Sequence, residues 1–64
     1  MAIKFRYIIY KMLDDKSLEV FHVSPCFENT FEKALHQGKY FLNRYFHRSR
    51  KIFYIDIEEK DMFD

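Results

Sequence analysis

The sequence predicts a single α+β domain over residues 1–64, with a three-stranded antiparallel sheet and one helix packed on one face, in the order ββαβ. Three observations predict this fold. Two alternating apolar segments flank a short polar break, which is the pattern of a β-hairpin. An amphipathic segment with helical spacing follows, and a third alternating segment comes last. A chain of 64 residues builds one hydrophobic core.

The first strand is predicted over residues 3–13, because apolar side chains recur there at every second position. One face carries Ile3, Phe5, Tyr7 and Ile9. The opposite face begins with Lys4 and Arg6 and continues with Ile8, Tyr10 and Met12. The first strand therefore has an apolar stretch on both of its faces.

A polar break over residues 14–17, Asp-Asp-Lys-Ser, is typical of a hairpin built around a type I turn. The second strand is predicted over residues 18–24 and alternates Leu18, Val20 and His22 with Glu19, Phe21 and Val23. Pro25 has no backbone donor, so it should end this strand or restrict it to a sheet edge.

The helix is predicted over residues 30–48, with Asn29 or Thr30 as its N-cap and Glu32 at the capping-box distance from Asn29. Its apolar stripe follows the i, i+3, i+4, i+7 pattern through Phe31, Ala34, Leu35, Gly38, Phe41, Leu42, Tyr45 and Phe46. Gly38 lies within that stripe and indicates a close approach to the sheet. We expect the stripe to pack on Phe5, Tyr7 and Ile9.

The third strand is predicted over residues 51–58, and residues 59–64 are expected to form a frayed acidic tail. A helical crossover makes the third strand parallel to the second, so it can pair antiparallel with the first. The resulting strand order is 2-1-3, and the helix covers one face only. The other face is the outer face of the sheet.

Composition limits the class of protein. The net charge is +1, which by itself favours neither nucleic acid nor a membrane. The single Cys26 cannot form an internal disulfide, and charged residues interrupt the N-terminal apolar run, so we expect a cytoplasmic protein. Eight Phe and five Tyr exceed what one small core can hold. Some of these aromatic rings should therefore lie on a contact surface.

The sequence contains no phosphate-binding, hydrolase or metalloprotease motif. His22, Ser24 and Cys26 are close in sequence, but a small single-helix domain offers them little cleft, and we expect packing or surface roles. His36 and His47 are about 16 Å apart along a helix, too far to share one ion. We expect no enzyme activity, no cofactor and no metal.

Two surfaces are predicted to bind partners. On the outer face we expect an apolar patch of Ile8, Tyr10 and Met12, joined by Phe21 or Tyr54 and rimmed by Lys4 and Arg6. Such a patch suits a protein partner or a homodimer. The second surface is the basic end of the helix, with Arg44, Arg48, Arg50 and Lys51. It suits an acidic protein surface or, as the less favoured alternative, the phosphates of a nucleic acid.

The return strand Lys51-Ile52-Phe53-Tyr54-Ile55-Asp56 completes a layout that resembles small phage antitoxin and anti-defence proteins of the Dmd type. The resemblance spans the chain as a layout and carries over no functional residue. It implies a phage-type inhibitor or antitoxin-like protein. The sequence thus predicts a small non-enzymatic protein-binding module that masks a partner surface. The alternative is a small nucleic-acid-binding protein that uses the basic end of its helix.

Overall fold

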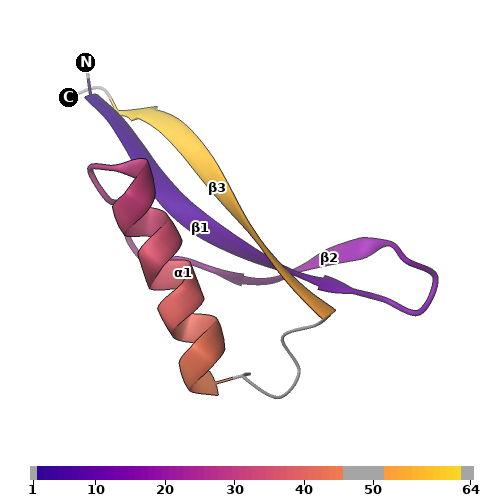
Figure 1. Cartoon of the computed structure of the whole chain (residues 1–64). Helices are drawn as coiled ribbons and strands as arrows, with labels where there is room; N and C mark the ends of the chain where they lie inside the picture. The colour runs from indigo at the N-terminus through magenta and orange to yellow at the C-terminus, as the bar shows by residue number, and fades with distance from the viewer. Residues whose placement is uncertain (1, 46–51, 63–64) are drawn as a thin grey trace.

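A computed structural model describes residues 2–45 and 52–62. Its elements follow in the order β1 (Ala2–Met12), β2 (Leu18–Val23), α1 (Phe31–Tyr45) and β3 (Phe53–Met62). The strands form one antiparallel sheet in the order β2-β1-β3, and α1 lies on one face of this twisted sheet (Figure 1). The predicted fold class, element order and strand order are confirmed.

The turn between β1 and β2 is a three-residue loop. The amide of Lys16 donates to the carbonyl of Leu13 at 2.9 Å, and the amide of Leu13 donates to the carbonyl of Ser17 at 2.8 Å. Lys16 has a φ of 69°, in the left-handed region. A type I turn followed by one left-handed residue is a common three-residue hairpin loop. The Asp15 carboxylate accepts hydrogen bonds from the hydroxyl and amide of Ser17, and these bonds lower the pKa of Asp15.

Strand β2 contains a β-bulge. Ile9 pairs with His22, but the next residue, Tyr10, pairs with Val20, so Phe21 is an extra residue in β2. In a bulge of this kind two consecutive side chains turn towards the same face of the sheet. Phe21 and His22 therefore both lie on the helix side.

The rings of this bulge pack against the core. The ring of Phe21 lies 4.8 Å from that of Phe53, and the His22 ring stacks on Phe41 at 4.0 Å with an interplanar angle of 2°. Strict alternation along β2 had placed Phe21 on the outer face, and that expectation is wrong. The bulge shifts the alternation by one residue, and this takes the Phe21 ring away from the outer face.

Helix α1 begins after Thr30, which is its N-cap. The Thr30 hydroxyl accepts a hydrogen bond from the amide of Lys33 at 3.1 Å, the geometry of a capping residue. The side chain of Asn29, the other candidate, accepts instead from the Lys4 ammonium group. The helix is described as far as Tyr45, so residues 46–48 of the predicted helix lie outside the described residues.

The core lies between α1 and the sheet. Its buried members are Tyr7, Ile9, Leu42 and Phe53, with Phe41, Ile55 and Ile57 packed against them. The predicted helix-facing side of β1 is therefore confirmed for Tyr7 and Ile9. Phe5 lies on the same side, because its ring meets that of Phe31 edge to face at 6.3 Å. Phe46, also predicted in the core, lies outside the described residues.

Gly38 sets how closely α1 can approach the sheet. A Cβ atom at this position would lie 3.1 Å from Cγ2 of Ile55 and 3.1 Å from Cβ of Tyr7. The Cβ of Tyr7 is fixed by the central strand and cannot move aside. The close approach predicted from Gly38 is confirmed, and a larger residue here would push the helix away from the sheet.

Strand β3 runs further than predicted. It begins at Phe53 and continues to Met62, with Ala2 paired to Met62 and Arg6 paired to Glu58. The expected frayed tail is thus wrong for residues 59–62, while residues 63–64 lie outside the described residues. The reason is that the first half of β1 needs a partner for its backbone groups, and β3 supplies it.

Replacing Leu42 with Ala should destabilise the domain, because the Leu42 side chain is 7% exposed and fills the core. We expect the free energy of unfolding to fall by about 2–4 kcal/mol in urea titrations. Tyr40→Ala is the matched control on the same helix, since Tyr40 is 56% exposed. It should change stability by about 0.5 kcal/mol or less. Equal losses for the two variants would contradict this packing.

Replacing Lys16 with Gly should stabilise the hairpin, because a side chain at φ 69° crowds the following carbonyl and glycine does not. We expect a gain of about 0.5–1 kcal/mol in the free energy of unfolding. Asp14→Gly, in the same loop but without a positive φ, should lower stability by a similar amount. A lower free energy of unfolding for Lys16→Gly would show that the left-handed conformation of Lys16 does not destabilise the hairpin.

Candidate functional site

Apolar side chains form a continuous row on the outer face of the sheet. Tyr10 of β1 lies between its cross-strand partners Val20 of β2 and Tyr54 of β3, and Met12 lies beside Leu18. Leu18, Val20 and Tyr54 are 52%, 57% and 44% exposed. These five residues are called the outer patch. Since they are cross-strand neighbours, they form one surface.

The predicted members of this surface have different exposures. Tyr54 is exposed and Tyr10 and Met12 are half-buried, so all three are within reach of a partner. Ile8 is only 8% exposed. Its cross-strand neighbours are Val23 and Asp56, and the side chains around it leave little of it in contact with solvent. Ile8 therefore lies next to the outer patch on the same face but offers little surface to a partner.

The end of the outer face beyond Ile8 is charged, as predicted from Lys4 and Arg6. The Arg6 guanidinium binds the Glu58 carboxylate of β3 at 2.9 Å and lies 4.9 Å from the ring centroid of Phe27. The Lys60 ammonium is 5.9 Å from the same ring. The segment after β2 thus places Phe27 over this end of the face, and the outer patch ends there.

The predicted basic surface is described only at Arg44. Its side chain is exposed, and its guanidinium donates to the Tyr40 hydroxyl at 3.5 Å. Arg48, Arg50 and Lys51 lie outside the described residues. The structure therefore describes one member of this predicted surface, Arg44.

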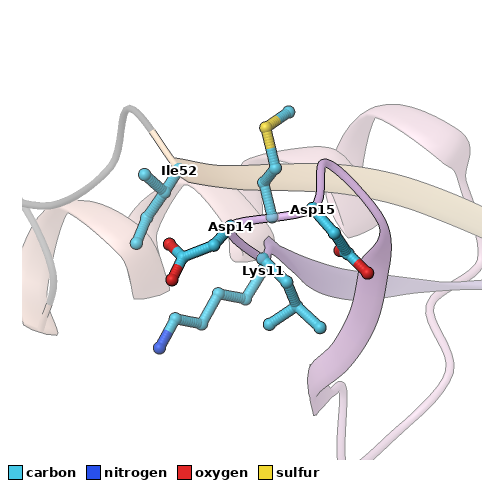
Figure 2. Close-up of a pocket in the computed structure, with 6 residues that line it drawn as sticks. Lys11, Asp14, Asp15 and Ile52 are labelled. Carbon is cyan, nitrogen blue, oxygen red and sulfur yellow. The ribbon is translucent and has the colours of Figure 1, made fainter.

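A hollow of about 620 Å³ lies beside the hairpin turn. Its lining consists of Lys11, Met12, Leu13, Asp14, Asp15 and Ile52. Figure 2 shows the Asp14 carboxylate on the side of Lys11 and Ile52, whereas the Asp15 carboxylate points the opposite way. The Asp15 carboxylate accepts hydrogen bonds from Ser17, so the two carboxylates are not directed at one point of the hollow.

A second groove, of about 640 Å³, runs between α1 and β3. Its lining consists of Leu35, Lys39, Leu42 and Asn43 from the helix and Phe53, Tyr54 and Ile55 from the strand. No pattern in the sequence predicted this groove. The apolar stripe of the helix is wide, and this width is the sequence feature that could have indicated the groove. Leu35 and Leu42 lie seven residues apart in the stripe, on the side of the helix that faces β3.

The residues His22, Ser24 and Cys26 do not form a nucleophilic site. The thiol of Cys26 lies 3.4 Å from the Glu28 carboxylate, and this contact raises the pKa of the thiol. The Ser24 hydroxyl donates to the carbonyl of Cys26 at 2.7 Å. His22 stacks on Phe41 and forms a hydrogen bond with the Tyr7 hydroxyl at 3.2 Å. A reactive cysteine needs a neighbour that favours the thiolate, and Glu28 does the reverse.

Within residues 2–45 and 52–62, no group of three or more His, Cys, Asp or Glu side chains is placed to hold a metal ion. In the same ranges, no helix has the length and apolar character needed to cross a membrane.

Comparisons with known proteins found no family model, no curated protein and no solved structure that matches this chain significantly.

Tyr7 should make the domain sensitive to alkaline pH. Burial, and secondarily the nearby Cys26, raises the pKa of the Tyr7 phenol. The unfolded chain therefore loses this proton first, and stability should fall as the pH rises above the ordinary tyrosine pKa of about 10. We expect the urea midpoint of the wild type to drop more between about pH 9 and about pH 11 than that of Tyr7→Phe. Equal drops would contradict this role for Tyr7.

Proposed function

We propose that this chain is a small non-enzymatic protein-binding module, of the inhibitor or antitoxin-like kind, that works as a homodimer and masks a surface of a partner protein. The observation that carries the proposal is the outer patch. It is contiguous across all three strands, and Leu18, Val20 and Tyr54 expose about half of their surface. Contiguous apolar patches on small proteins mark contact surfaces, whereas single exposed apolar residues are ordinary.

The charges around the outer patch favour a second copy of the chain as its occupant. Asp14 and Asp15 lie at the hairpin end of the patch, while Lys4 and Lys60 lie together at the other end of the same sheet face. A second copy packed face to face and turned end for end would place acidic groups opposite basic ones. A two-fold axis produces this arrangement with the same patch on both copies.

A face-to-face dimer would leave the other surfaces accessible. Helix α1 and the groove beside it lie on the opposite side of the sheet. The outer edge of β3, which no described strand pairs with, would also stay accessible, because face-to-face packing uses side chains and not backbone groups. Masking of a partner protein would then use these remaining surfaces, two sets of them per dimer.

The dimer is tested by a double variant of the outer patch, Leu18→Ser with Val20→Lys. Both side chains are more than half exposed, so the fold should survive. Light scattering should give twice the chain mass of 8.0 kDa for the wild type and the single-chain mass for the variant.

The matched control is Ile3→Ser with Tyr40→Lys, because these residues are equally exposed apolar side chains outside the outer patch. This control should remain dimeric. A monomeric wild type at the highest soluble concentration, or a dimeric outer-patch variant, would refute the assignment of the patch to a second copy.

A further inference from the structure

Among residues 2–45 and 52–62, no strand pairs with the outer edge of β3, and this open edge lies directly beside the groove between α1 and β3. We infer that edge and groove together bind an extended segment of a partner protein, which adds a fourth strand to the sheet. The segment is basic in its first half and apolar in its second half. The inference rests on the proposed function, since it names the chemistry of the masked partner, but the surface it uses shares only Tyr54 with the outer patch.

The backbone of β3 offers unpaired groups along this edge. Phe5 of β1 exchanges two backbone hydrogen bonds with Glu28, at 2.9 and 2.6 Å, on the β2 side. In an antiparallel ladder, alternate residues point their N–H and C=O groups to opposite sides. Phe5 faces Glu59 across the β1–β3 ladder, and Tyr7 faces Ile57. Glu59 and Ile57 therefore turn their backbone groups outward, towards the open edge.

A side-chain contact independently supports the outward direction of the Ile57 backbone amide. The amide of Ile57 donates to the carboxylate of Asp56, the preceding residue, at 2.9 Å. That amide is free to do so only because it takes no part in the ladder with β1. A strand added at this edge would offer a backbone carbonyl in place of the carboxylate.

The groove supplies room for alternate side chains of an added strand. In strand addition, main-chain hydrogen bonds hold the peptide, and pockets for every second side chain select its sequence. Leu35 and Leu42 line the helix side of the groove, and Phe53 and Ile55 line the strand side. This lining matches the half of the edge near Phe53, so the partner residues opposite that half are apolar.

The other half of the edge is acidic. Glu59 and Asp61 are exposed, and within residues 2–45 and 52–62 neither carboxylate has an ion-pair partner. Partner residues opposite this half are therefore Lys or Arg. A second copy fits poorly here. Antiparallel pairing of two full β3 strands would set the acidic half of each strand, with Glu59 and Asp61, against the apolar half of the other, so neither half would meet a complementary surface.

Antiparallel addition fixes the order of the segment. A strand running against β3 meets Asp61 and Glu59 first and Ile55 and Phe53 last, so its basic residues precede its apolar residues. A suitable probe is a short capped peptide in which Lys alternates with Thr in the first half and Val alternates with Thr in the second. Binding is measured by the fluorescence anisotropy of the labelled peptide.

Three results are expected. The probe should bind saturably, and its copy with Glu in place of Lys should bind about tenfold more weakly or worse, with the difference shrinking in high salt. A copy N-methylated on the amides that face β3 should also lose about tenfold or more, because N-methylation removes the main-chain donors. No saturable binding by the probe, or equal binding by the N-methylated copy, would overturn the inference.

Variants of the protein locate the site. Glu59→Pro removes an outward amide from an edge strand, where proline is tolerated, and should weaken binding about tenfold, whereas Glu59→Ala should stay within about threefold. Leu35→Glu in the groove should weaken binding, and Gln37→Glu on an exposed part of the same helix should not. Circular dichroism checks that each variant folds. The N-methylated probe is measured on the wild-type protein, so this test of the edge does not depend on any variant folding.

The outer-patch variant separates this inference from the proposed dimer. Leu18→Ser with Val20→Lys should bind the probe as the wild type does, because both residues lie on β2, which β1 separates from the β3 edge. If the probe binds but the wild type is monomeric, only the dimer fails. If the wild type is dimeric and the probe does not bind, only the edge site fails. Loss of probe binding in the outer-patch variant would overturn the location at β3.

Discussion

Strand β1 bonds to a neighbouring strand on both sides, and every other element takes its position from it. On one face its Tyr7 and Ile9 are buried, and α1 is seated on them through Gly38, where a Cβ would come within 3.1 Å of the strand. A helix held so closely to one face cannot also cover the other. The single helix therefore leaves Tyr10 and Tyr54 uncovered within the described part of the chain, and the outer patch is a direct result of this packing.

Local patterns were sufficient to predict the elements and their order. The helix and the hairpin follow from spacing within a few residues, and Gly38 indicated the close contact. The bulge could not be found in this way, because strict alternation assumes one residue opposite each partner, and Phe21 breaks that rule. The end of β3 was missed for a related reason. Its acidic composition resembles a solvated tail, and only the distant residues Ala2–Arg6 give it a pairing partner.

The candidate site could be predicted in part. Alternation placed Tyr10, Met12 and Tyr54 on the outer face, and the register confirms that they are on one surface. It could not show that the Ile8 side chain is only 8% exposed. The groove beside β3 depends on where α1 lies relative to the edge of the sheet, and no spacing within the helix contains that information. Both proposed contact surfaces thus arise from strand pairing and helix placement, with no sequence motif.

The β1–β3 ladder also determines how the chain can fold. It joins Ala2 to Met62, almost the full length of the sequence, whereas the β1–β2 hairpin and α1 form from near neighbours. Bringing distant residues together costs much chain entropy before their contacts stabilise the structure. This ladder should therefore form last. Until then, β1 presents an unpaired edge with apolar side chains on both faces. The interval before β3 pairs is therefore the stage of folding at which association between incomplete chains competes most strongly with the native structure.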